Sequence, residues 1–162
     1  MSASTPILSA TPLVDHDCGW AFVQRRPGSE QQGLFSHKAF STGSVLCRFS
    51  AAARFTQPNR LTIQTAETEH IHLLPACLSF TNHSCTPTVF FNMQSFELEA
   101  LQAIQPGDEL TFFYPSTEWD MAESFACNCG SPQCLGNIRG ARYLPASTLN
   151  RYRLNEFIKH LL

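Results

Sequence analysis

The chain has 162 residues, 43% of them hydrophobic, and this length and composition suit one compact domain with a core of its own. Its formal net charge is −2, and no lysine or arginine occurs from Leu61 through Ile138, so clustered cations for phosphate recognition are missing and direct nucleic-acid binding is not expected. No stretch approaches the roughly twenty apolar residues of a membrane span, and Met1 to Val14 has no basic residue ahead of its few apolar ones, so we expect a soluble intracellular protein, cytoplasmic or nuclear, without membrane contact.

The hydrophobic pattern predicts a mainly β chain of short strands. The predicted strands are apolar, β-branched or alternating runs separated by turn residues, and they cover Val45–Phe49, Leu61–Thr65, His70–Leu73, Val89–Asn92, Phe96–Leu101 and Glu109–Tyr114. A loop rich in Gly, Ser and Gln precedes them at 27–32, and Pro106-Gly107-Asp108 fits a tight turn between the last two.

Two helices are predicted. Pro75 to Thr81 reads as a short helix with proline in its first turn, and it delivers Asn82 at its end. The tail reads as a second, amphipathic helix that Ser147 can cap, because apolar residues repeat at three- and four-residue spacing at Leu154, Phe157, Ile158, Leu161 and Leu162. We expect this stripe to dock on the domain, with a partner's surface as the alternative.

The seven cysteines indicate a metal site. An odd number of cysteines in a chain without an export signal argues against a disulfide framework and for reduced thiols. Cys127, Cys129 and Cys134 crowd into one short turn, where three thiolates can occupy only three corners of a tetrahedral zinc, so a distant segment must supply the fourth. The remaining cysteines outside the motifs are expected to be buried apolar fillers, namely Cys18, Cys47 and Cys77.

The charges are unevenly distributed. The cation-free stretch holds nine acidic residues: Glu67, Glu69, Glu97, Glu99, Asp108, Glu109, Glu118, Asp120 and Glu123. This excess predicts a negative potential that attracts a basic ligand, and the alternative is a solvated acidic face without function. A rival metal site at Glu69-His70-Ile71-His72 would use two imidazoles on one strand face, but no third ligand is evident.

Four segments in this order resemble the SET-domain family of protein lysine methyltransferases. They are Gly33-Leu34-Phe35 with Ser41-Thr42-Gly43-Ser44-Val45-Leu46, then Thr81-Asn82-His83-Ser84-Cys85, then Pro106-Gly107-Asp108-Glu109-Leu110-Thr111-Phe112-Phe113-Tyr114, and finally Cys127 to Cys134. Together they cover the chain from about His16 to about Tyr143.

The resemblance implies a SET-domain, β-clip-like fold of small curved sheets with short helices, a C-terminal helix and a threaded (pseudoknot) C-terminal segment. It divides the chain into an N-terminal extension (1–15), the SET domain (16–122), a post-SET zinc-binding segment (123–143) and the C-terminal helix (144–162).

The resemblance also implies the site residues. S-adenosylmethionine would be bound by Gly33, Leu34, Phe35, Asn82, His83, Tyr114 and Leu135. Tyr114 would be catalytic, Phe112 and Phe80 would line the substrate channel, and one structural zinc would be held by Cys85, Cys127, Cys129 and Cys134. The backbone of His83, rather than its ring, is expected to fix its position. The substrate would be the lysine of a basic protein or peptide, with a histone as one case, and the oligomeric state stays undetermined.

The chemistry of methyl transfer gives the Tyr114 hydroxyl a role. Methyl transfer from a sulfonium requires a neutral amine, whereas lysine has an unperturbed pKa of about 10.4. A dry aromatic channel disfavours the ammonium, and the Tyr114 hydroxyl can orient the amine's lone pair. The alternative is a core tyrosine bonded to a backbone carbonyl.

Three positions depart from the family pattern. Gln31-Gln32-Gly33 keeps only one of two glycines, Ser79 stands where an arginine is common, and Phe113 replaces an acid before the tyrosine. Two alternatives therefore stay open: a catalytically weak or inactive zinc-binding interaction module, and a zinc-knuckle scaffold without cofactor.

Overall fold

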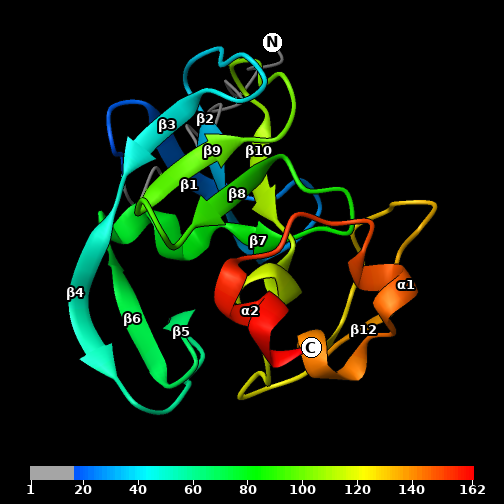
Figure 1. The fold of residues 1–162 in the computed structure, drawn as a ribbon. Coiled ribbons are helices and arrows are strands. Elements are labelled where there is room, and N and C mark those ends of the chain that lie inside the picture. Colours follow the sequence, from blue (N-terminus) through cyan, green and yellow to red (C-terminus); the bar gives the residue numbers. More distant parts are fainter. Residues whose placement is uncertain (1–16) are drawn as a thin grey trace, which may run out of the picture.

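The computed structural model describes residues 17–162, so the expected extension 1–15 lies outside the described residues. The fold is mainly β, and its central sheet has the order β1-β2-β10-β7 (Figure 1). β2 pairs antiparallel with β1 and β10, whereas β7 runs parallel to β10. The strands span Ala21–Arg25 (β1), Gln32–Ser36 (β2), Asn82–His83 (β7) and Glu109–Phe112 (β10). The parallel pair places the Asn82-His83 motif directly beside the strand that leads to Tyr114.

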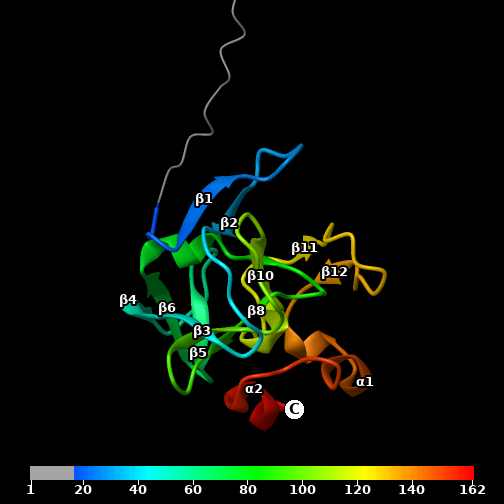
Figure 2. The same cartoon turned by 90° about the horizontal axis from the view of Figure 1, so that it is seen from above.

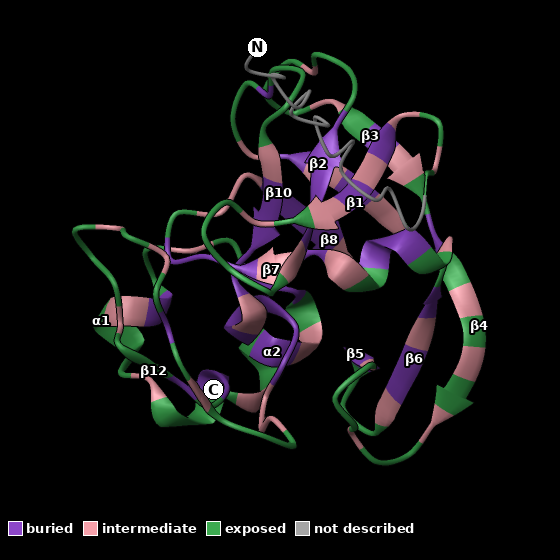
Figure 3. Ribbon diagram, turned by 180° about the vertical axis from the view of Figure 1, so that it is seen from behind, coloured by how far each residue is buried: buried purple, intermediate pink, exposed green. Residues whose placement is uncertain are grey.

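Two three-stranded sheets complete the main body, in the orders β3-β9-β8 and β4-β6-β5. The first contains β3 (Val45–Arg48), β8 (Val89–Asn92) and β9 (Glu97–Ala100); the second contains β4 (Ser50–Phe55), β5 (Ile63–Ala66) and β6 (Glu69–Leu74). No residue of β4 is fully buried, whereas β6 is buried along much of its length (Figure 3). The second sheet extends on one side of the molecule in Figure 1.

The structure contains the predicted strands, but the strand predicted at Glu109–Tyr114 ends two residues earlier than expected. β10 stops at Phe112, and Tyr114 opens a short 3-10 helix, η2 (Tyr114–Ser116). The fixed φ of Pro115 suits this first turn, so the chain leaves the sheet just before the tyrosine. The predicted helix before Asn82 is the 3-10 helix η1 (Ala76–Phe80), and the expected tight turn forms at Pro106-Gly107, where Gly107 has a φ of +91°.

The single C-terminal helix was a wrong prediction. The tail forms two short helices, α1 (Ala146–Leu149) and α2 (Glu156–Leu161), which lie along the edge of the molecule opposite the β1–β2 hairpin (Figure 2). Residues 150–155 separate them, and Asn155, directly before α2, is extended, with its side chain bonded to Phe91 O, Ser116 O and the Met93 N–H. These contacts to β8 and η2 replace the helical hydrogen bonds. The expected docking is confirmed, since Leu154 and Ile158 are buried.

The core has three parts. The largest lies between the sheets and includes Leu34, Phe91 and Leu110. A second gathers around Phe113 and the tail, and a third surrounds Cys85 and Cys127, with the strands β11 (Phe125–Ala126) and β12 (Asn137–Ile138) beside it. The 3-10 helix η3 (Ala141–Tyr143) connects these last two parts.

Cys18 and Cys77 correct the expectation that they are separate fillers. The structure joins them as a disulfide, with their Cα atoms 6.6 Å apart, so the N-terminal edge of the described chain is linked to η1. Cys47 remains a free, half-buried thiol. Within residues 17–162, no helix is long and apolar enough to cross a membrane.

Candidate functional site

A cavity of about 800 Å³ lies where the parallel strands β7 and β10 end. One wall contains residues 79–83 with Phe112 and Tyr114, a second contains 121–129, and a third contains 58–63. Residues 30–32 and Arg26 close the remaining side. Segments that are far apart in the sequence therefore meet around one space, as the motifs predicted.

Asn82 is held by side chains and backbone of the β1–β2 hairpin. Its Nδ2 donates to Gln32 O at 2.8 Å and to Glu109 Oε1 at 3.2 Å, and its Oδ1 accepts from Gln31 Nε2 at 3.0 Å. Arg26 Nε lies 3.0 Å from both carboxylate oxygens of Glu109. The Asn82 amide is thus fixed in orientation, and Gln31 reaches it from the position where the family keeps its first glycine.

Gly33 is needed for close approach. A Cβ atom at this position would lie 2.7 Å from Glu109 Oε1 and 3.2 Å from Asn82 Nδ2. Any larger residue would displace Asn82, which lines the cavity, and Glu109, which bonds its amide. Leu34 and Phe35, which the resemblance assigns to the cofactor, have buried side chains, and neither they nor Gly33 line the cavity.

Tyr114 faces the cavity beside Phe112, with their ring centroids 4.6 Å apart. Its hydroxyl donates to Thr81 O at 3.3 Å, which is the backbone-carbonyl contact expected of a core tyrosine, made here at a cavity wall. Burial, followed by the charge of Glu118, raises the pKa of Tyr114 to about 12, so the phenol is neutral and available as a hydrogen-bond partner. Phe80, half-buried, lines the same wall.

The His83 ring connects the tyrosine turn to the cysteines. Its Nδ1 accepts the Tyr114 N–H at 3.1 Å, and its Nε2 lies 3.3 Å from Cys85 Sγ. Burial lowers the pKa of His83 to about 4, so the ring is neutral and the Nδ1 acceptor places the proton on Nε2. His83 was expected to be positioned mainly by its backbone, and the structure adds a role for the ring, which bridges the two motifs.

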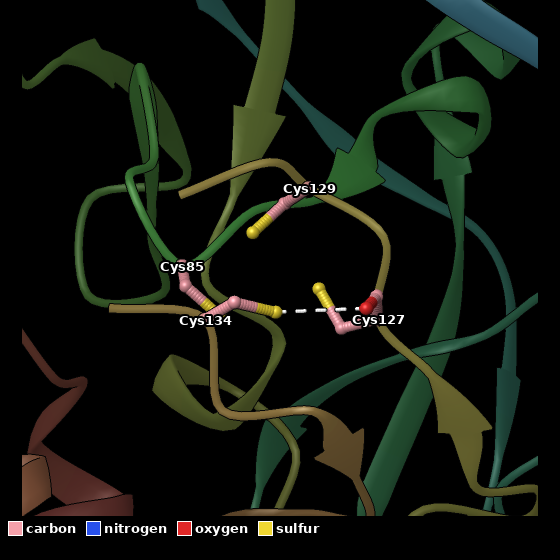
Figure 4. Close-up of side chains that lie close together, drawn as sticks. All are labelled: Cys85, Cys127, Cys129 and Cys134. Carbon is pink, nitrogen blue, oxygen red and sulfur yellow. Dashed lines mark hydrogen bonds between the residues drawn. The ribbon is translucent and has the colours of Figure 1, made fainter. Parts of the chain in front are cut away.

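The four predicted cysteine ligands meet (Figure 4). Their sulfur atoms all lie within 4.8 Å of one another and point toward a common centre, although Cys85 comes from the loop after β7 and the others from 127–134. A tetrahedral zinc with bonds of about 2.3 Å needs sulfurs about 3.8 Å apart, so this donor set fits the metal. Leu135 N–H donates to Cys85 Sγ at 3.4 Å, and burial raises the pKa of Cys85 to about 11, so metal binding here releases protons.

Leu135 does not reach the cavity wall. Its half-buried side chain packs against the cluster around Phe113 and the cluster around the cysteines, and it is not among the lining residues. Phe113, where the family has an acid, is 2% exposed and stacks on Tyr152 with ring centroids 3.6 Å apart and planes 7° from parallel. An apolar environment at this position explains the replacement.

The rival histidine site is not formed. His70 is buried and His72 half-buried, with His70 Nδ1 and His72 Nε2 lacking hydrogen-bond partners. Over residues 17–162, the only group of three or more metal-ligating side chains is the cysteine cluster.

The acidic stretch is largely neutralised by cations from other segments. Five of its members form ion pairs: Glu69 with Arg54, Glu97 with Arg48, Glu99 with Arg153, Glu109 with Arg26 and Asp120 with Arg142. The remaining acids that line the cavity are Glu118 and Glu123. The other two unpaired acids, Glu67 and Asp108, are exposed outside the cavity, so about half of the unpaired acids of this stretch can act on a ligand in the cavity.

Sequence reasoning missed two buried polar side chains at this site. Glu118 lines the cavity and Asn155 fastens the tail to it from behind. Only one signal could have drawn attention to Glu118: it is the acid in an otherwise uncharged run that follows Glu109. No local sequence pattern marks Asn155, because its partners are Ser116 in η2, Phe91 in β8 and Met93 just after β8.

Comparison with known proteins gives consistent results. The SET domain model matches residues 31–115, slightly more than half of the chain. Methyltransferase flvH of Aspergillus flavus is 41% identical over 126 residues, which cover 76% of this chain and 70% of that protein. Histone-lysine N-methyltransferase ash1 of Drosophila melanogaster is 36% identical over 69 residues, covering 38% of this chain and 3% of that protein.

A solved structure has the same fold. The crystal structure of KRYPTONITE in complex with mCHH DNA, H3(1-15) peptide and SAH matches with a TM-score of 0.54 and 22% sequence identity, covering 71% of this chain and 28% of that one. The chain thus spans under a third of this structural neighbour. The motifs, the meeting of Asn82 with Tyr114 and the match over 31–115 agree, and the chain belongs to the SET-domain family of methyltransferases.

Proposed function

We propose that this protein transfers methyl groups from S-adenosylmethionine to the lysine side chain of a basic protein or peptide. The observation that carries the proposal is that Asn82, in β7, and Tyr114, which follows the adjacent parallel strand β10, line the same cavity of about 800 Å³. A cavity of this size accommodates a cofactor-sized molecule and one extended side chain.

Cofactor binding, exclusion of water and orientation of the amine are assigned to different residues around the cavity. S-adenosylmethionine supplies the methyl group as an electrophilic sulfonium. Asn82 with Gln31 and Gln32 would hold its amino-acid end, and Gly33 would allow their close approach. The His83 segment would support it, and the rings of Phe112 and Phe80 would exclude water from the amine. The Tyr114 hydroxyl would orient the amine's lone pair, so catalysis is positioning and desolvation.

We propose one structural zinc at Cys85, Cys127, Cys129 and Cys134. Four thiolates leave no open position on the metal, so it stabilises structure and does not activate water. Cys127 and Cys129 also line the cavity, so the metal would fix one of its walls. Its contribution is to hold 121–129 against the loop after β7.

A histone-type peptide is one substrate within this class. Among the relatives, ash1 is named a histone-lysine methyltransferase, and the KRYPTONITE complex contains an H3(1-15) peptide. The unpaired acids Glu118 and Glu123 at the cavity favour a cationic ligand.

The test is incubation with methyl-labelled S-adenosylmethionine and a panel of basic peptides that includes histone H3 residues 1–15. We expect label on lysine with the native chain and at least about a 100-fold loss in Tyr114→Phe. Tyr143→Phe is the matched control, because its hydroxyl bonds Asp120 on the exposed surface. Equal transfer by the native chain and Tyr114→Phe would refute the role of Tyr114.

A second candidate, a zinc-binding interaction module without turnover, is favoured by one observation. Gln31 Nε2 donates a hydrogen bond of 3.0 Å to Asn82 Oδ1, and the cofactor would need the same oxygen as its acceptor. Thermal unfolding with and without S-adenosylmethionine, together with the transfer assay, distinguishes the enzyme from the interaction module and from a scaffold without cofactor. Stabilisation without transfer to any peptide supports the module, and no stabilisation at all supports a scaffold without cofactor.

A further inference from the structure

Glu118 is a buried carboxyl group placed four residues after Tyr114. Its backbone N–H donates to Tyr114 O at 2.9 Å, and its carbonyl accepts the Ala141 N–H at 2.8 Å. The residue is 7% exposed. It is therefore rigidly attached both to the tyrosine turn and to η3.

Only one of its carboxylate oxygens has partners. Oε1 accepts the Gln64 N–H at 2.8 Å and the Thr117 hydroxyl at 3.2 Å. In the part of the chain that the structure describes, Oε2 has no hydrogen bond and Glu118 has no ion pair. Five other acids of the same stretch are paired with arginines, but no arginine pairs with Glu118.

Oε2 is not one of the fully buried side-chain atoms that lack a hydrogen bond, so it is open to the cavity. A carboxylate oxygen that faces a cavity without a protein partner can pair with a cationic ligand. Glu118 lines the same cavity as Tyr114, and its charge contributes to the raised pKa of the tyrosine. Burial raises the pKa of Glu118 itself to about 7, which the hydrogen bonds from Gln64 and Thr117 only partly offset. A group with this pKa can exchange a proton near neutrality.

We propose that Glu118 receives the substrate's amino group, pairing its free carboxylate oxygen with the ammonium and taking one proton from it before methyl transfer. The inference rests on the proposed function and assigns the residue that delivers a neutral amine. The N–H bond breaks with its electron pair left on nitrogen, and an O–H bond forms on Glu118. The nitrogen pair then forms the bond to the methyl carbon while the carbon–sulfur pair leaves with sulfur, and the proton on Glu118 returns to water through the cavity.

Other charged and titratable groups around the cavity are further from this role. Arg26 is paired with Glu109, Arg60 and Glu123 are exposed, and His83 is neutral. Glu30, Tyr114 and the thiols of Cys127 and Cys129 complete the set on the wall, and His70 lies opposite Gln64 on β6. None of the cations neutralises Glu118, so the cavity keeps a site for an external cation.

The decisive variant is Glu118→Gln, which preserves the acceptor for Gln64 but can neither pair with nor deprotonate an ammonium. We expect kcat for a methylated peptide to fall about 100-fold at pH 7 and to recover toward the native value as pH approaches 10, where the amine loses its proton unaided. Affinity for S-adenosylhomocysteine should stay within twofold. Glu67→Gln, at an exposed acid outside the cavity and without an ion pair, should behave as the native chain.

A loss that is the same at every pH, or no loss, overturns the role of Glu118 while leaving the proposed function intact. A native chain that methylates no peptide overturns the proposed function, and a second measurement then still decides this inference. In carboxyl-labelled protein, the ¹³C resonance that Glu118→Gln removes should shift on addition of n-butylammonium and should not shift with tetramethylammonium, which has no N–H. An unchanged resonance overturns the proposal.

Discussion

The hydroxyl of Tyr152 donates a hydrogen bond of 2.8 Å to the backbone carbonyl of Cys85, 67 residues earlier in the chain. The same ring stacks on Phe113, next to Tyr114. One tail residue thus supports both the metal-binding loop and the end of β10.

Tyr152→Phe keeps the stacked ring and loses the hydrogen bond, so we expect it to lower the free energy of unfolding by about 1 kcal/mol. Tyr152→Ala removes both contacts and should cost about 3–5 kcal/mol, with weaker metal retention. Urea unfolding of the two variants measures this difference. Tyr143→Phe serves as control, because this exposed tyrosine contacts only the surface around Asp120, Arg139 and Arg142.

Metal analysis tests the cysteine cluster. The native chain should hold one zinc, and Cys85→Ser and Cys129→Ser should each abolish it, because a hydroxyl does not replace a thiolate ligand. Removing the metal with a chelator should lower the melting temperature by about 10 °C. Cys47→Ser is the matched control, since Cys47 is half-buried and outside the cluster. Full zinc retention in Cys85→Ser would show that the fourth ligand has been assigned wrongly.

Gly33→Ala should raise the Kd for S-adenosylmethionine at least tenfold. Its Cβ would stand 2.7 Å from Glu109 Oε1 and displace the carboxylate that orients Asn82, at a cost to stability of about 1–3 kcal/mol. Isothermal titration gives both affinity and stoichiometry. Gly43→Ala places its Cβ in open space at a φ of +81°, so it should cost about 1–2 kcal/mol through backbone strain and leave affinity unchanged. Equal affinities in the two variants would contradict this explanation of Gly33.

Phe112→Tyr should shift the products toward lower methylation states. The Phe112 ring stands 4.6 Å from that of Tyr114 at the cavity wall, and an added hydroxyl there would hold a water or the amine itself and take up the room of a further methyl group. Mass spectrometry of the peptide products over a time course reads the methyl count. An unchanged distribution at equal turnover would show that this ring does not limit product size.

Glu118 makes stability depend on pH in a predictable direction. Its pKa is raised from 4.5 to about 7, so the folded chain binds more protons than the unfolded chain between these values, and stability falls as pH rises through that window. The shift corresponds to about 3 kcal/mol. Glu118→Gln should therefore exceed the native stability by about that amount at pH 8, and the gain should vanish below pH 4. A gain that does not vary with pH would show that the carboxyl group is not the cause.

Much of the fold could be predicted from local patterns. Val89–Asn92 forms the predicted strand to the residue, because a β-branched and aromatic run opposite Phe96–Leu101 has both propensity and a partner. β4 was not predicted, since Ser-Ala-Ala-Ala has poor strand propensity and is extended only by pairing with β6. The meeting of Asn82, Tyr114 and the four cysteines was implied by the resemblance to the SET-domain family, whereas the residues alone indicated only that a distant segment must supply a fourth ligand.

What failed depended on contacts between distant residues. Asn155 interrupts the tail helix through partners on β8 and η2, and Glu118 is held by Gln64, 54 residues away. Neither contact leaves a trace in local periodicity. The Cys18–Cys77 disulfide contradicts the prediction of reduced thiols at these positions, because a count of cysteines does not show which of them lie close in space.

Asn155 also has a consequence for synthesis of the protein. A nascent chain that has just completed residues 31–115 still lacks three of the four thiols and the amide that ties Phe91 to Ser116. Residues 31–115 would therefore leave the ribosome incompletely folded and sensitive to protease until Asn155 emerges. Protease digestion of arrested nascent chains of increasing length would locate the chain length at which protection begins.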